Sequence, residues 1–249
     1  MISYEYPLHE RVRTYLRLEH LFQQMRPQQT VTSEDYMGYF NTLFAILDLC
    51  ERSDIRTDLL KDLERRKTQL QFWAAHPDVS SPALEATRNQ LEQSYLALTR
   101  ASRIGSALKQ TRFLASIRQR FAMPGGTCNF DLPQLHYWLA QPPASRQQAQ
   151  ALWWSELAEL AQALALELHM LREQVPFTGA IAALGLFQEN TEALALLRLQ
   201  IPAAVPAYPV VSGHKQRYSI RFMRSEPEQG RASFEHDVEF LIARCPLCQ

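Results

Sequence analysis

The hydrophobic periodicity of this chain changes once, near residue 176, and that change constrains the fold more than any single motif. From about His9 to Gln174, apolar residues recur at the spacing of three to four that is typical of amphipathic helices. Beyond Pro176 the apolar runs become short, rich in β-prone residues and separated by turn residues. We therefore expect an α+β protein, with a mainly helical N-terminal domain over residues 1–176 and a small antiparallel β-domain over 177–249.

The helical region is expected to form a bundle that contains a long antiparallel hairpin. Apolar residues at Ile55, Leu59 and Leu63 begin a helix of about 20 residues that ends at His76-Pro77, and a second long helix opens at Ser81-Pro82. A short loop containing proline between two long helices is typical of an antiparallel pair. Further helices are expected over about 8–25, 33–50, 106–121, 132–141 and 145–174, and short strands near 2–6 and 126–130 could join the sheet.

The last two predicted strands show the clearest alternation. In 215–224 the apolar residues Tyr218, Ile220 and Phe222 occupy every second position. In 234–242 the even positions are mostly apolar, with Phe234, Val238, Phe240 and Ile242, while three acidic residues take odd positions: Glu235, Asp237 and Glu239. A period of two with one polar face indicates an antiparallel sheet that is exposed to water on one side.

Composition excludes several classes of function. The 26 basic and 26 acidic residues balance, which argues against a general nucleic-acid binder, because phosphate binding needs a basic excess. The longest apolar or small run, Ala180–Phe187, is too short to span a bilayer, and the N-terminus lacks the apolar core of a secretory signal. The cysteines are few and irregularly spaced, as expected of reduced cytosolic thiols. We expect a soluble cytoplasmic protein that binds no membrane.

Motifs for catalysis or metal binding are weak. No glycine-rich phosphate loop is present. Cys128, Asp131 and His136 could form a nucleophile, orienting carboxylate and base, but a buried structural thiol is the favoured interpretation. Cys245 and Cys248 form a single C-x-x-C pair, whereas a structural zinc site needs four ligands. We therefore expect no enzyme activity, metal or cofactor, with a Cys/His-centred enzyme or a zinc-dependent interaction module as the alternatives.

A cluster of basic residues is the strongest binding signal. The segment 212–224 contains no acidic residue, and its basic residues are His214, Lys215, Arg217, Arg221 and Arg224. Lys215, Arg217 and Arg221 share one face of the predicted strand, where their guanidinium and ammonium groups favour a peptide that carries carboxylates. The alternative is structural: Glu235, Asp237 and Glu239 on the next strand could pair with this face as ordinary cross-strand ion pairs.

Several long blocks of the sequence resemble the ZapD family of Z-ring-associated proteins. They occur in the same order along nearly the whole chain and are Tyr6–Glu19, Glu51–Leu63, Pro124–Leu139 and Tyr208–Met223. The agreement is loosest around 74–97 and after Arg224. Long ordered blocks are more specific than any short motif, so they decide the resemblance.

The resemblance implies a non-catalytic cytoplasmic homodimer that is recruited to midcell by FtsZ, cross-links and bundles FtsZ filaments, promotes Z-ring assembly and lowers FtsZ GTP turnover. It also implies that a basic pocket holds the C-terminal peptide of FtsZ and places Arg52 there, beside Arg217 and Arg221. The full set of expected FtsZ-binding residues is Arg52, Arg56, Lys215, Arg217 and Arg221. The Cys-Pro-Leu-Cys end and the acidic strand before it depart from the family pattern.

Overall fold

The computed structural model describes residues 1–249 except 26–29, 75–81, 102–103, 215–216, 227–229 and 248–249. The chain divides into two compact units, one of residues 1–16 with 168–249 and one of residues 17–167, and each is described by itself. The first unit contains the N-terminus because the first strand pairs within the sheet of the C-terminal region. The α+β class expected from the sequence is confirmed.

The helices follow the predicted order. Their bounds are α1 Glu10–Met25, α2 Tyr36–Arg52, α3 Ile55–Ala74, α4 Pro82–Arg100, α5 Ser106–Gln110, α6 Arg112–Phe121, α7 Pro133–Leu139 and α8 Pro143–Glu173. The helix predicted over 106–121 is two helices, because Thr111 takes an extended conformation with φ −66° and ψ 109°. The segment 126–130, expected as a strand, forms consecutive turns after Gly125, whose φ of 73° suits glycine.

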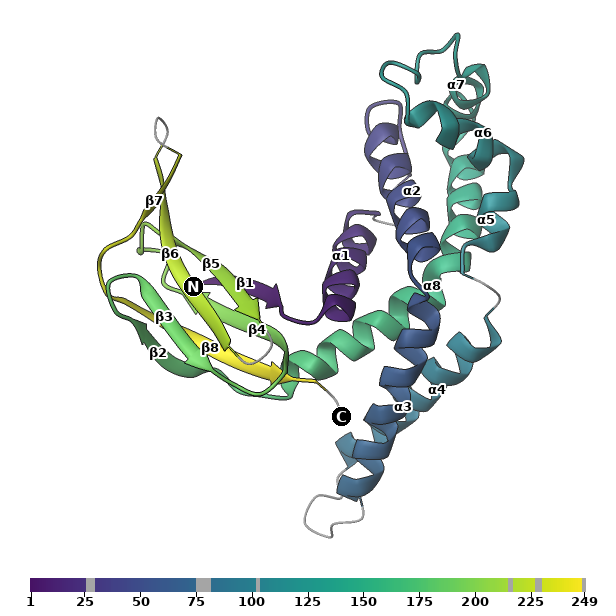
Figure 1. Cartoon of the computed structure of the whole chain (residues 1–249). Helices are drawn as coiled ribbons and strands as arrows, with labels where there is room; N and C mark the ends of the chain where they lie inside the picture. The colour runs from purple at the N-terminus through teal and green to yellow at the C-terminus, as the bar shows by residue number, and fades with distance from the viewer. Residues whose placement is uncertain (26–29, 75–81, 102–103, 215–216, 227–229, 248–249) are drawn as a thin grey trace. The chain divides into compact units, whose positions relative to one another are not determined.

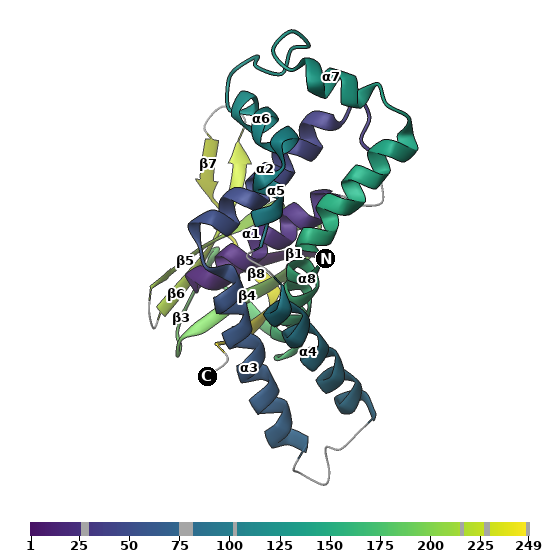
Figure 2. The same cartoon turned by 90° about the vertical axis from the view of Figure 1, so that its right-hand side faces the viewer.

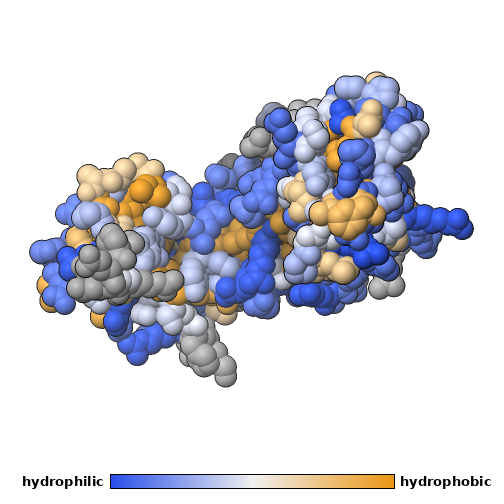
Figure 3. All heavy atoms as spheres, turned by 90° about the horizontal axis from the view of Figure 1, so that it is seen from above, coloured by the Kyte–Doolittle hydropathy of each residue, from blue (hydrophilic) through white to orange (hydrophobic). Residues whose placement is uncertain are grey.

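An aromatic cluster forms the centre of the helical unit. Phe40 is fully buried and contacts rings from α2, α6, α7 and α8, with ring centroids 5.6–6.3 Å apart; these rings are Phe44, Phe113, Phe121, Trp138 and Trp153. Large rings at these separations bury much apolar surface and hold several helices together. Some apolar side chains stay exposed on this unit, among them Met123, Phe130 and Leu152, and hydrophobic residues are visible on its surface in Figure 3.

Helices α3 and α4 lie side by side and antiparallel, as the sequence predicts (Figures 1 and 2). A buried ion pair joins α3 to α8 inside the helical unit. The Arg66 side chain is 2% exposed and that of Glu167 is 6% exposed, with Arg66 Nη2 3.0 Å from Glu167 Oε1. Arg66 Nε also donates to both carboxylate oxygens at 3.2 Å. This pair fixes the hairpin against the long helix within the unit.

The other unit is built from two four-stranded antiparallel sheets. The strands are β1 Ile2–Pro7, β2 Thr178–Ala182, β3 Leu186–Asn190, β4 Leu194–Ile201, β5 Tyr208–His214, β6 Arg217–Glu226, β7 Gly230–Ser233 and β8 Val238–Pro246. One sheet has the order β1-β4-β8-β2, and the other has β3-β6-β5 with β7 pairing to β6. Apolar side chains from both sheets share one core, which includes Leu197, Leu199, Ile220, Phe222, Phe240 and Ile242.

A tight turn carries the chain from the first sheet to the second. Gly185 ends this turn with φ 73°, and its carbonyl accepts a hydrogen bond from Phe222 N at 2.8 Å. A Cβ at this position would lie 1.8 Å from the Phe234 carbonyl oxygen. Only glycine therefore fits between β2 and β3, and the turn sets the register of β3 on β6.

Candidate functional site

Strand β6 carries the basic residues that the sequence singled out. The alternation predicted for it is confirmed, since Tyr218, Ile220 and Phe222 are buried in the shared core while Arg217 and Arg221 are exposed. The two arginines are four strand positions apart, which corresponds to about 13 Å along the strand. Lys215 lies outside the described residues, so the structure places two of the three residues expected on this face.

The neighbouring strands complete this exposed surface in register. Leu186 of β3 and Val210 of β5 lie opposite Arg221, and Asn190 and His214 occupy the positions opposite Arg217. Between these rows, Gln188 and Ser212 lie opposite Ser219. We call this surface the basic face; its described outward residues are Leu186, Gln188, Asn190, Val210, Ser212, Arg217, Ser219 and Arg221.

The basic face has no carboxylate among its described residues. Glu189, the acidic residue of β3, alternates to the other side of its strand, where Tyr218 Oη and Arg244 Nε donate to it, the latter at 2.7 Å. Arg217 Nη2 donates to the neutral Gln188 Oε1 at 2.5 Å. Arg221 makes no hydrogen bond or ion pair with any residue that the structure describes. The described neighbours of Arg217 and Arg221 therefore do not neutralise their positive charges, and both guanidinium groups can bind a ligand.

The sheet topology overturns the structural alternative for these arginines. The acidic residues considered as their cross-strand partners precede or begin β8, which pairs with β2 and β4 in the other sheet. Glu239 lies opposite Ile181, and Asp237 Oδ1 accepts a hydrogen bond from Leu184 N at 2.8 Å. The strands that do flank β6 in these rows are β3 and β5. The cross-strand ion pairs are therefore wrong as an explanation of Arg217 and Arg221.

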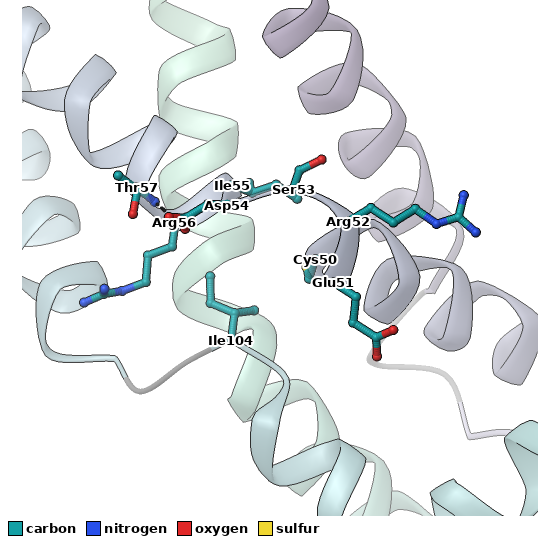
Figure 4. Close-up of a pocket in the computed structure, with 9 residues that line it drawn as sticks. All are labelled: Cys50, Glu51, Arg52, Ser53, Asp54, Ile55, Arg56, Thr57 and Ile104. Carbon is teal, nitrogen blue, oxygen red and sulfur yellow. Dashed lines mark hydrogen bonds between the residues drawn. The ribbon is translucent and has the colours of Figure 1, made fainter.

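Arg52 and Arg56 lie at the junction of α2 and α3, around a cavity of about 470 Å³ (Figure 4). Arg52 is the last residue of α2, and its exposed side chain extends away from Arg56. It has no hydrogen bond or ion pair with the part of the chain that the structure describes. Cations at a helix C-terminus interact favourably with the helix dipole, so the position tolerates an unpaired guanidinium.

Arg56 has a structural contact that the sequence did not indicate. Its Nε donates to the Leu98 carbonyl at 2.9 Å, and its Nη2 donates to the Thr99 carbonyl at 2.6 Å. These carbonyls belong to the last turn of α4, where helix carbonyls lack intrahelical partners. Arg56 therefore joins the start of α3 to the end of α4 within the hairpin.

The acidic residues beside Arg52 are already engaged by other groups. Glu51 accepts from Arg118 at 2.9 Å and pairs with Lys109 at 3.1 Å, and the hydrogen bond from Arg118 is the main cause that lowers the pKa of Glu51 to about 2. Thr57 N donates to Asp54 Oδ1 at 3.3 Å at the start of α3, and the bonds from Thr57 lower the pKa of Asp54. Arg52 therefore keeps its charge available to a ligand.

The expected binding residues thus fall into two groups in different units. Arg52 and Arg56 belong to the helical unit, and Arg217 and Arg221 belong to the sheet unit. The sequence did not single out Leu186, Gln188 or Val210, because they reach the basic face only through the pairing of β3 and β5 with β6. The residue pattern of one strand does not indicate which strands pair with it in the sheet.

The geometry of the described residues does not support the catalytic or zinc-binding roles considered for the cysteines. Cys128 is exposed, so the expectation of a buried thiol is wrong, and its Sγ makes no hydrogen bond to His136 in the described structure. Asp131 pairs instead with Arg120 at 3.6 Å. Cys245 is buried in β8, and Cys248 lies outside the described residues. Within the described ranges, no three residues of the His, Cys, Asp or Glu types come together as metal ligands.

Comparison with known proteins decides the family. The family model ZapD, described as cell division protein, matches residues 16–221. The chain belongs to the ZapD family. A cell division protein ZapD of Idiomarina loihiensis is 45% identical over 245 residues, which cover 98% of this chain and 96% of that relative. Those of Yersinia enterocolitica and Yersinia pestis are 42% and 41% identical over 239 residues, covering 94% of this chain and 96% of each relative.

The resemblance inferred from the sequence blocks is confirmed, and membership of the ZapD family assigns the chain to cell division. The span matched by the family model contains Arg52, Arg56, Arg217 and Arg221. Among the described residues, no helix has the length and apolarity needed to cross a membrane.

Proposed function

We propose that this ZapD-family protein binds FtsZ through the acidic C-terminal tail of FtsZ and bundles FtsZ filaments. The observation that carries the proposal is the basic face, which presents two exposed arginines and no described carboxylate. An arginine forms two parallel hydrogen bonds to a carboxylate, so a pair of arginines about 13 Å apart suits an extended peptide with separated acidic residues. In this proposal Arg52, which is exposed in the helical unit, and Lys215, which belongs to the basic sequence segment 212–224, also contact the tail.

Bundling requires two binding sites in one particle, and we assign the second site to a homodimer formed through the helical unit. The hairpin of α3 and α4 keeps large apolar side chains exposed, including Phe72 and Leu96. Exposed apolar side chains on long helices favour association with a second copy. A dimer that holds one FtsZ tail in each protomer links two filaments, because the second contact benefits from a high effective concentration.

The protein acts without catalysis of its own in this proposal. It works in the cytoplasm, where FtsZ recruits it to the division site at midcell. Bundled filaments exchange subunits more slowly, which lowers the GTP turnover of FtsZ and promotes Z-ring assembly. Neither a metal nor a cofactor takes part.

Co-sedimentation with polymerised FtsZ tests the proposal. The protein should pellet with filaments of full-length FtsZ and stay in the supernatant with filaments that lack the C-terminal tail. Light scattering should show bundles in the first case alone. Equal pelleting with both kinds of filament would refute recognition of the tail.

A further inference from the structure

The two arginines of the basic face have unlike surroundings. Arg217 has polar neighbours, since it donates a hydrogen bond to Gln188 and lies opposite Asn190. Arg221 stands between two aliphatic residues, with Leu186 opposite it on β3 and Val210 opposite it on β5. The basic face therefore has an apolar end at Arg221 and a polar end at Arg217, and the strand register determines which end is which.

The register places these aliphatic side chains against Arg221. Residues directly opposite each other in an antiparallel sheet point to the same face, with Cβ atoms about 4.5–5.5 Å apart. Leu186 is 37% exposed and Val210 is 36% exposed, whereas Val211 and Ile220, which point to the other side of the sheet, are buried. The stem of Arg221 thus runs between two aliphatic side chains, and its guanidinium has no partner among the described residues.

This arrangement has a chemical consequence for a bound peptide. A carboxylate that reaches Arg221 approaches a cation beside apolar surface, where water screens the attraction less than on an open polar face. An apolar ligand side chain two residues from that carboxylate lies on the same face of an extended peptide, where it would cover Leu186 and Val210 and remove their surface from water. At the other end, Arg217 and Gln188 offer hydrogen bonds and no comparable apolar surface.

We propose that Leu186, Val210 and Arg221 form a subsite for an acidic residue and an aliphatic residue two positions away, because side chains two positions apart share one face of an extended peptide. Arg217 receives a second carboxylate four positions away along the extended ligand, because four positions of strand span about 13 Å in both chains. The ligand class is an extended acidic peptide with one apolar anchor, which occupies the Arg221 end of the basic face. The inference rests on the proposed function of the basic face and names the sequence preference of that site.

Fluorescence anisotropy with the full chain and two labelled synthetic peptides tests the subsite. Both peptides carry two aspartates four positions apart; one has a leucine two residues from an aspartate, on the side away from the other aspartate, and the second peptide has a serine there. The wild-type protein should bind the leucine peptide about fivefold to tenfold more tightly, because partial burial of a leucine covers on the order of 40–60 Å² of apolar surface.

Variants test which residues produce the preference for the leucine peptide. Leu186→Ser combined with Val210→Ser should bind the two peptides equally, and each single variant should retain part of the difference. Ile181→Ser, which alters an aliphatic residue of β2 that is 59% exposed, is the matched control and should keep the full preference. Arg221→Gln should weaken both peptides. Circular dichroism melts confirm that these outward substitutions leave the fold intact.

Three results would overturn the subsite: a double variant that still prefers leucine, a wild type that binds both peptides equally, or a wild type that binds neither. If the wild type shows no preference while FtsZ still pellets it through the tail, the subsite fails and the proposed function stands. If the preference follows Leu186 and Val210 while co-sedimentation is independent of the tail, FtsZ is the wrong partner and the subsite stands.

Discussion

The buried pair of Arg66 and Glu167 should make a large contribution to the stability of the helical unit. Arg66 makes three hydrogen bonds of 3.0–3.2 Å to the Glu167 carboxylate, and both side chains are almost fully buried. Replacing Glu167 with Gln removes the carboxylate charge that accepts these three hydrogen bonds and leaves a neutral amide beside the buried guanidinium. Loss of one partner of a buried pair costs about 3–5 kcal/mol, which for a chain of this size lowers the melting temperature by about 6–20 °C.

Thermal unfolding followed by circular dichroism measures this effect. Glu92→Gln is the matched control, because Glu92 pairs with Lys67, the residue after Arg66, in a partly exposed pair at 2.6 Å. That variant should melt close to the wild type, since water screens exposed pairs. The combination Arg66→Met with Glu167→Leu should recover most of the stability, because an apolar pair needs no counterion. A Glu167→Gln variant that melts like the Glu92→Gln control would refute the reasoning.

Three further predictions address other parts of the chain. The pKa of Glu51 is depressed from 4.5 to about 2, so the ion pairs of Glu51 stabilise the fold above pH 4.5. This stabilisation is lost as the pH falls from 4.5 towards 2. The difference in melting temperature between wild type and Glu51→Gln should therefore shrink over that window. The double variant Cys245→Ser with Cys248→Ser should still bundle FtsZ, as measured by light scattering. The hydroxyl introduced at the buried position 245 lowers the stability of the fold by about 1–3 kcal/mol. Loss of bundling together with loss of bound zinc would reveal a metal site. Light scattering should give twice the chain mass of 28.7 kDa at micromolar concentration, and a stable monomer would remove the bivalent mechanism.

Local patterns predicted most elements of the fold. The helical spacing gave the α3–α4 hairpin and the long α8, and the alternation at Tyr218, Ile220 and Phe222 gave the inward face of β6. The break at Thr111 was missed because both sides of it continue the same apolar spacing. Strand β7 was also missed, since Gly230–Ser233 is short and lacks a period of two in apolar residues.

The site depended on information that no local pattern contains. The sequence placed Arg217 and Arg221 on one face, which is confirmed, but it left open whether acidic residues lie opposite them. That question depends on which strands adjoin β6, and strand order is set by packing of the two sheets around a shared core. The same topology brought Leu186 and Val210 beside Arg221 from positions 35 and 11 residues away in the sequence.

Charge reversal on the basic face tests the central claim most directly. Arg217→Glu combined with Arg221→Glu should leave the fold and the dimer intact and reduce affinity for the FtsZ tail about thirtyfold or more, because loss of charged anchors in a binding site costs about 2–5 kcal/mol. Arg52→Glu should act in the same direction, and raised salt should weaken the wild-type contact. Arg112→Glu, at an exposed arginine at the start of α6, is the matched control. We predict that co-sedimentation with FtsZ filaments is lost in the double variant and kept in the control; a folded double variant that pellets at the wild-type level would contradict the account.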